Sequence, residues 1–371
     1  AVNPRLDKYG GMIERDANGV RINYGATGYF YQKWIDDIAW LITPDGNKFY
    51  YKAMCTAQPY VYSNVSEFEN LPDSSGKFAP AFNLSDPENP QYSAVIANSI
   101  IKYGTAGWRD GYIAESKNRL KDWGFNAIGG WTTREAYQYN MPYVYVIKLG
   151  DLQAYSIKIG PKQLPDPFDP NLEGAIYKYV SGMLKNQTKG TLATDPNFIA
   201  YGIGNEMEFC GWGVKDRYLI IKNILAKDQT SYAKQDLVAW LEARYPDFSE
   251  FEALWQTGKT SFASVLSSKL TGYDPNTKSD ECHNVMNLYI ERFADKLFET
   301  CVNGIRQFDT NHMIWGPRFI TWPSDTIIRS AAKYFDVLSF DVYSYKFYGD
   351  LFDKFYNVAK EFKTPFIISE Y

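Results

Sequence analysis

The sequence predicts an α/β protein whose main unit is a (β/α)8 TIM barrel, with the eighth strand missing from this chain and a β-rich extension at the N-terminus. Short strands that are apolar along their whole length alternate with helical stretches after residue 107, which is typical of a parallel sheet covered on both faces. No glycine-rich phosphate loop follows any of these strands, which favours a barrel over a doubly wound nucleotide-binding sheet.

The chain divides into a β-rich extension, predicted over residues 1–47, and a barrel domain over 48–371. Within residues 40–50, two apolar runs flank a Pro-Asp-Gly sequence, a combination typical of a β-hairpin. Residues 56–100 are rich in Pro, Asn and Ser, and we expect them to form a long loop.

Helices are predicted over 109–123, which precedes Gly124, and over 170–184, where Asp169 is a suitable N-cap and a proline opens the first turn. Residues 214–309 are predicted to be mostly helical. The seven expected barrel strands are 49–53, 125–131, 143–147, 198–204, 313–316, 337–342 and 365–369.

Charge and hydropathy exclude two classes of partner. Lys and Arg number 39 and Asp and Glu 43, so the net charge of −4 provides no broad basic footprint for nucleic acid. No apolar run approaches the roughly 18 residues that a membrane-spanning helix needs. The chain begins with Ala and has no basic and apolar leader, so we expect a mature protein of secreted or periplasmic localisation.

Aromatic residues make up 17% of the chain and include 30 Tyr, more hydroxyl-bearing rings than a core requires. Tyr and Trp suit a wet cleft that offers an apolar face and a polar edge, as sugar-binding clefts do. The four Cys and two His show no metal-ligand spacing, so we expect no metal and no cofactor.

Two glutamates follow buried strands directly. Glu206 comes after the fourth predicted strand and Glu370 after the seventh. Burying an unpaired carboxylate costs several kcal/mol, which favours positions facing a polar cleft. Because both lie at the same rim of a barrel, they match the acid and the nucleophile that glycoside hydrolysis needs.

This pair, with Asn205 before the first glutamate, resembles that of glycoside hydrolase clan A, the retaining (β/α)8 glycosidases. The resemblance implies that Glu206 is the acid/base and Glu370 the nucleophile. Within the clan the chain is most similar to the β-agarase group and related galactan hydrolases. The stretches that carry this similarity are 40–46, 119–126, 166–170 and 195–201. The implied substrate is a polysaccharide or oligosaccharide, such as agarose.

The same resemblance implies that Asn205 donates to the sugar 2-hydroxyl and that Tyr343, preferred over Tyr345, keeps the nucleophile ionised. Three tryptophans at strand ends or in rim loops could stack on pyranose rings or pack in the core: Trp131, Trp212 and Trp322. Arg318 could bind a hydroxyl or an anionic substituent, or form a salt bridge.

The chain stops one residue after Glu370, so the eighth strand is absent and we expect a further segment or chain to complete the barrel. The main alternative is a non-catalytic carbohydrate-binding protein on a degenerate barrel. An inverting hydrolase is a third possibility, with carboxyls roughly 6.5–9.5 Å apart instead of about 5–5.5 Å.

Overall fold

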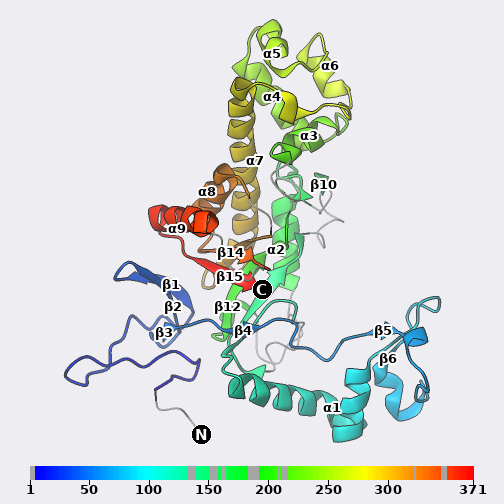
Figure 1. The fold of residues 1–371 in the computed structure, drawn as a ribbon, viewed down its shortest axis with the longest axis vertical. Coiled ribbons are helices and arrows are strands. Elements are labelled where there is room, and N and C mark those ends of the chain that lie inside the picture. Colours follow the sequence, from blue (N-terminus) through cyan, green and yellow to red (C-terminus); the bar gives the residue numbers. More distant parts are fainter. Residues whose placement is uncertain are drawn as a thin grey trace.

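The computed structural model describes residues 5–132, 139–149, 158–159, 164–182, 192–207, 209, 216–320, 323–343 and 349–371. Its centre is a curled parallel sheet of seven strands (Figure 1). The strands are β4 (Ala53–Met54), β8 (Ala127–Ile128), β9 (Tyr143–Ile147), β12 (Phe198–Ile203), β13 (Met313–Phe319), β14 (Val337–Asp341) and β15 (Phe366–Glu370). They neighbour one another in sequence order, as in a barrel, and β4 and β15 are the two edges. The predicted barrel lacking one strand is confirmed.

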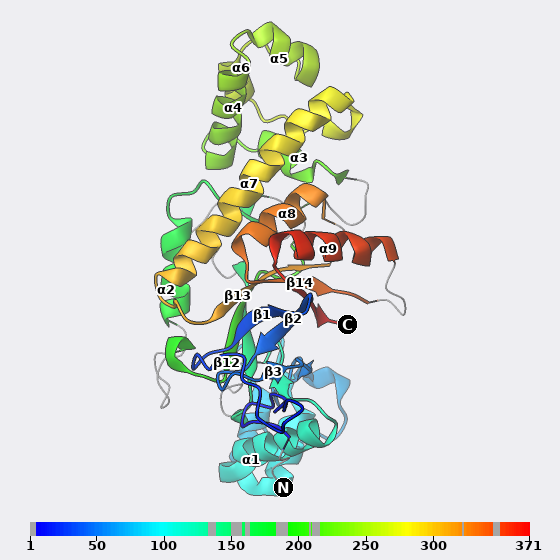
Figure 2. The same cartoon turned by 90° about the vertical axis from the view of Figure 1, so that its left-hand side faces the viewer.

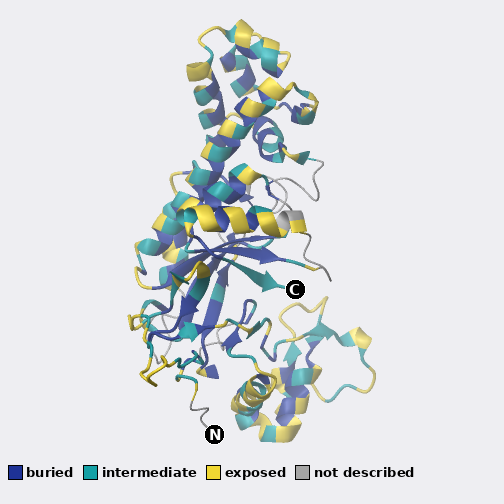
Figure 3. Ribbon diagram, turned by 60° about the vertical axis from the view of Figure 1, so that its left-hand side comes forward, coloured by how far each residue is buried: buried dark blue, intermediate teal, exposed yellow. Residues whose placement is uncertain are grey.

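The middle strands lie deepest, as their apolar sequences predict. All residues of β12 and β13 are buried, whereas those of β15 are only half-buried because one side of that strand has no partner (Figure 3). A parallel sheet covered by helices needs such fully apolar strands.

Helices cover the outer face of the sheet. These are α2 (Leu172–Gly182), α7 (Asp280–Arg306), α8 (Asp325–Tyr334) and α9 (Gly349–Phe362), and α8 and α9 lie over β14 and β15 (Figure 2). Helix α7 packs tightly on α2, where a Cβ at Gly304 would come within 2.8 Å of Ile176. Asp169 lies in the turn before α2, accepting the N–H of Asn171 at 2.9 Å, so the helix begins two residues later than predicted.

A helical extension rises from the sheet and accounts for the long helical region of the sequence. It consists of α3 (Leu219–Leu225), α4 (Tyr232–Arg244), α5 (Phe248–Trp255) and α6 (Phe262–Ser267), beside the first half of α7 (Figure 1). Several of its apolar side chains, among them Phe251 and Trp255, are completely buried. None of the described helices is long and apolar enough to span a membrane.

The N-terminal residues form an antiparallel sheet of β1 (Tyr31–Ile35), β2 (Ile38–Ile42) and β3 (Lys48–Phe49), which confirms the hairpin. Gly46 takes a φ of +81° in the turn, a conformation that favours glycine. The first barrel strand is not 49–53, because Phe49 pairs with β2 and the chain reaches the barrel only at β4.

The predicted loop over 56–100 is wrong as well. It contains β5 (Ser63–Asn64), β6 (Phe82–Asn83) and β7 (Gln91–Tyr92), and helix α1 (Ala94–Asp122) begins inside it. Aromatic and aliphatic side chains of this segment, including Tyr92, Ile96 and Trp108, form a small core of their own. Helix α1 is broken at Gly104, where φ is +77°, and its second part is the helix predicted over 109–123.

A buried polar cluster connects β12 to the turn before β13. The Asp309 carboxylate bonds to the His312 ring at 2.8 Å and accepts the Tyr201 hydroxyl at 2.8 Å. Burial alone would raise the pKa of Asp309, but the His312 hydrogen bond and charge, with donors from Asn311 and Tyr201, outweigh it and lower the pKa to about 2. The cluster therefore stabilises the fold through an ionised carboxylate.

Replacing this carboxylate should destabilise the protein in a pH-dependent way. Because the folded pKa of Asp309 lies below the ordinary aspartate value of 3.8, the stabilisation is complete above that pH and is lost as the pH falls toward 2. We expect Asp309→Asn to lower the free energy of unfolding by roughly 2 kcal/mol at pH 7. Urea denaturation at pH 7 and pH 3 measures this. An equal deficit at both pH values would contradict the assignment.

Candidate active site

The predicted catalytic residues lie at the ends of parallel strands. Glu206 follows β12, Arg318 is on β13, and Glu370 is the last residue of β15. Asp341, the last residue of β14, is in register with Glu370. Four consecutive strands thus deliver charged groups to one rim, the place where barrel enzymes carry out their chemistry.

Glu370 is held by three donors. Its Oε1 accepts the Tyr343 hydroxyl, and its Oε2 accepts the Trp131 ring N–H at 3.0 Å and an N–H of Arg318. Burial opposes ionisation of Glu370, but these three groups outweigh it and lower its pKa. The same contact, after burial, raises the pKa of Tyr343 above its ordinary value. Glu370 is therefore a fixed carboxylate near neutral pH.

Arg318 joins the two glutamate segments. Its side chain is 3% exposed and donates from Nε to the Asn205 side-chain oxygen at 2.9 Å, as well as to Glu370. Its main-chain carbonyl accepts the N–H of Glu206 at 2.9 Å. One residue of β13 therefore orients both the segment after β12 and the end of β15.

Glu206 has an unusual backbone. Its φ is +48°, in the left-handed region that non-glycine residues seldom adopt, and Trp131 shares this feature with a φ of +62°. Such residues concentrate at functional sites. The charge of Glu206 contributes to raising the pKa values of Tyr343 and Asp341, so its carboxyl lies near the same cluster as Glu370.

The other expected binding residues have definite contacts. Trp131 donates to Glu370, and its ring lies 5.3 Å from the Arg318 guanidinium carbon and 5.1 Å from the Lys148 ammonium. Arg318 points inward to carboxylates, which is the salt bridge that its sequence context left open. Trp212 and Trp322 lie outside the described residues.

Sequence reasoning missed Asp341 and Ser369. Asp341 is 4% exposed, accepts the Ser369 hydroxyl at 2.7 Å and lies 3.2 Å from the Arg318 guanidinium. Its signal was present, because a carboxylate that ends an apolar strand is what identified Glu370. Among the described residues, no His, Cys, Asp and Glu side chains form a group of three suited to a metal ion.

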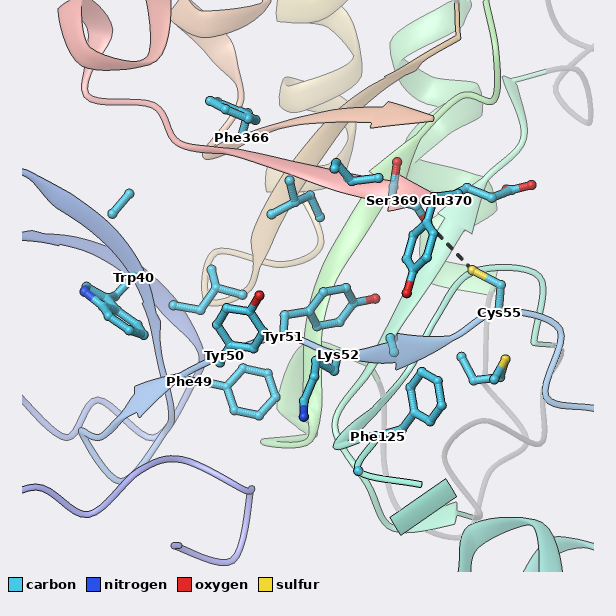
Figure 4. A pocket seen from close by; sticks show the side chains of 18 of the residues that line it. Trp40, Phe49, Tyr50, Tyr51, Lys52, Cys55, Phe125, Phe366, Ser369 and Glu370 are labelled. Atoms are coloured by element: carbon cyan, nitrogen blue, oxygen red, sulfur yellow. Dashed lines mark hydrogen bonds between the residues drawn. The ribbon is translucent and has the colours of Figure 1, made fainter. Parts of the chain in front are cut away.

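A groove of about 900 Å³ runs along the unpaired edges of β4 and β15 (Figure 4). Tyr50, Trp123 and Phe366 are among the side chains that line it, and Trp123 is 66% exposed. The edges of β4 and β15 approach each other at the rim, where the Cys55 thiol donates to the Ser369 carbonyl at 3.7 Å. The groove lies where the eighth strand of a barrel would run.

No protein-family model matches the sequence. The chain is similar to β-agarase A of Vibrio sp. (strain JT0107), with 29% identity over 301 residues, or 75% of this chain and 28% of the relative. The chain is homologous to this β-agarase. The resemblance to that group is confirmed, although the chain spans less than a third of that protein's length.

Solved structures agree with this relationship. PfGH50B superposes with a TM-score of 0.81 at 25% identity, over 99% of this chain and 55% of its own. An exo-β-agarase superposes with a TM-score of 0.79 at 20% identity, again over 99% and 55%. The second likeness, at this lower identity, concerns the fold alone.

Removing the tyrosine hydroxyl should weaken ionisation of Glu370. A donor to a carboxylate favours its charged form, so we expect Tyr343→Phe to raise the pKa of Glu370. Carboxyl ¹³C NMR titration measures the change directly. Tyr356→Phe on α9 is the control and should leave Glu370 unaffected. An unchanged Glu370 in the Tyr343 variant would mean that the hydroxyl does not hold the charge.

Proposed function

We propose that this protein is the catalytic unit of a retaining glycoside hydrolase in which Glu370 is the nucleophile and Glu206 the acid/base. The observation that carries the proposal is the fixing of the Glu370 carboxylate by Tyr343, Trp131 and Arg318. Three donors to an ionised carboxylate, next to a second glutamate at the same rim, are what a double displacement requires.

In the proposed mechanism, Glu370 attacks the anomeric carbon while protonated Glu206 gives its proton to the leaving oxygen. Glu206 then takes a proton from a water molecule whose oxygen attacks the anomeric carbon. The bond to Glu370 breaks, and the sugar is released with retained configuration. Trp131 and Arg318 orient the attacking oxygen Oε2, since both donate to it. Asn205, fixed by Arg318 through its side-chain oxygen, has its amide N–H2 left to meet a sugar hydroxyl.

The proposed substrate is a β-galactan such as agarose, cleaved outside the cytoplasm. The relationship to β-agarase A and the abundance of Tyr and Trp support this choice. The alternative is a carbohydrate-binding protein without turnover. Hydrolysis of agarose oligosaccharides and aryl β-galactosides separates the two, because a binding protein releases no product.

The two glutamates should fail differently. Glu206→Ala loses the proton donor, so dinitrophenyl glycosides, whose leaving group needs little protonation, should still form the glycosyl-enzyme, and azide should restore turnover as the β-glycosyl azide. Glu370→Ala loses the nucleophile and should give, at most, the α-azide. Each variant should lose about 10²–10⁴-fold activity on natural substrate, so product stereochemistry, read by NMR, assigns the roles.

This assay is done with the eighth strand in place. A β-azide from the Glu370 variant would reverse the two assignments. Absence of any glycosyl transfer from the unmodified enzyme would favour the binding protein.

We further propose that an extended segment, from a continuation or another chain, fills the groove and pairs with β4 and β15. Unpaired parallel edges present free N–H and C=O groups, and exposed apolar patches mark interaction sites. Ile38, Tyr50 and Trp123 are 57%, 64% and 66% exposed, and all three line this groove. The covering segment must therefore carry apolar side chains that pack against Ile38, Tyr50 and Trp123.

The 371-residue chain alone should self-associate through the uncovered groove. We expect the double variant Ile38→Lys/Trp123→Lys to shift the chain toward monomer in sedimentation velocity, because charges disfavour burial of the patch. Ile101→Lys is the matched control, since Ile101 is 69% exposed but does not line the groove. An equal shift in the control would show that general surface charge, not the groove, governs association.

A further inference from the structure

Asp341 is a buried carboxyl that the proposed mechanism does not use. Its Oδ1 accepts the Ser369 hydroxyl at 2.7 Å. Its Oδ2 lies 3.2 Å from Nη2 of Arg318 but accepts no hydrogen bond from the described residues. A buried carboxylate oxygen without a donor is costly, so its position needs a reason.

The reason lies in the guanidinium that it shares. Nη2 of Arg318 bonds to Oε2 of Glu370 and is also ion-paired with Oδ2 of Asp341. Two carboxylates from neighbouring strands therefore draw on one N–H2 group. Since the hydrogen bond goes to Glu370, Asp341 acts on the pair through its charge.

The titratable and charged groups around Asp341 come from several strands of the sheet. They are Arg318 of β13, Glu370 of β15, Glu206 after β12, Tyr343 after β14 and Cys55 after β4. Arg318 is the cation in this set, and the others are acids or weak acids. Ionisation of Asp341 thus adds a negative charge to a cluster in which acidic groups already outnumber the cation.

We propose that Asp341 is a positioning residue that sets the ionisation of Glu370 by sharing Arg318 with it. When Asp341 is ionised, its charge repels that of Glu370 and partly offsets the positive charge of Arg318. The pKa of Glu370 is then higher, so Glu370 is more basic. When Asp341 is protonated, Arg318 serves Glu370 alone, and Glu370 is held more tightly as a less reactive carboxylate. The consequence for catalysis rests on the proposed role of Glu370, but the electrostatic coupling does not.

The hydrogen bonds around Ser369 suit both states. The Ser369 oxygen lies 2.7 Å from Asp341 Oδ1, 2.6 Å from the Ser339 hydroxyl and 3.0 Å from the Phe340 carbonyl. With Asp341 ionised, Ser369 donates to it. With Asp341 protonated, Asp341 donates to Ser369, which then donates to Phe340. A proton on Asp341 therefore leaves Ser369 and the Phe340 carbonyl hydrogen-bonded, while Oδ2 of Asp341 has no hydrogen-bond donor among the described residues in either state.

The change also falls in an accessible pH range. Burial raises the pKa of Asp341 to about 6, with Arg318 and Ser369 opposing the rise and the charges of Glu370 and Glu206 adding to it. As the pH rises through that value, Asp341 becomes negative and disfavours the charge on Glu370. The two carboxyls therefore titrate as a coupled pair.

Carboxyl ¹³C NMR titration of the 371-residue chain tests the coupling without requiring activity. In the unmodified protein we expect Asp341 to titrate near pH 6 and Glu370 to show a second, smaller inflection at the same pH. Asp341→Asn should abolish that inflection and lower the pKa of Glu370, because a like charge has been removed. This direction is opposite to that expected for Tyr343→Phe.

Two further variants complete the design. Asp336→Asn is the matched control, since Asp336 directly precedes the same strand and pairs with Arg306 at 3.0 Å, away from the rim. It should leave the Glu370 titration unchanged. Ser369→Ala keeps the Asp341 carboxyl but removes its donor, so both the Asp341 step and the Glu370 inflection should move to higher pH.

The proposal is overturned if Glu370 titrates identically with and without the Asp341 charge. Should Asp341→Asn fail to fold, the Ser369→Ala comparison decides the matter, because an Asp341 step that moves alone would equally overturn it. If the unmodified enzyme shows no hydrolysis while the Asp341 and Glu370 titrations remain coupled, the result counts against the proposed function only.

Discussion

The buried guanidinium of Arg318 is the interaction on which the rim of this barrel depends. A buried cation without partners is costly, so the chain must bring acceptors to it from several strands at once. Asn205 arrives after β12, Asp341 ends β14 and Glu370 ends β15. The main-chain carbonyl of the same arginine fixes the N–H of Glu206. Misplacing any of these strands by one residue would break the set.

The two central strands, β12 and β13, are also held in place at the end away from the rim. Tyr201 of β12 and the Asp309–His312 pair before β13 form a second buried polar cluster, away from the rim. The Asp309 carboxylate accepts hydrogen bonds from neighbouring donors, so it stays ionised. Because these donors come from separate segments, the cluster also fixes the register between them. With apolar packing along the full length of β12 and β13, this cluster gives the rim a rigid base. Rigid support is what a preorganised site needs.

Glu370 lies on the edge strand and not on one of these central strands. The residues of β15 are half-buried, and the groove beside them runs up to Ser369 and Glu370 (Figure 4). The position of Glu370 therefore depends on its side-chain donors more than on sheet pairing. Whatever segment covers the groove would also add to the support of that carboxylate, which links completion of the barrel to the proposed chemistry.

The sequence by itself determined the strand order, the strand ends that carry Glu206 and Glu370, and the likeness to agarases. Those features are local, because an apolar run of five or six residues followed by a carboxylate is visible without knowing its neighbours. Segment 56–100 was misjudged because its aromatic residues form a core only after folding back on one another. The first strand was misplaced because the pairing of Phe49 with β2 depends on a partner strand.

Only the tertiary structure decided what Arg318, Trp131 and Asp341 do. Their spacing along the chain holds no sign that one guanidinium would meet two carboxylates, or that an indole N–H would point at Glu370. These contacts join residues from different strands, and they follow from the curl of the sheet, which brings the strand ends together at one rim. A one-dimensional pattern can place a charged residue at a strand end, but its partner is set by which strand lies beside it and in which register.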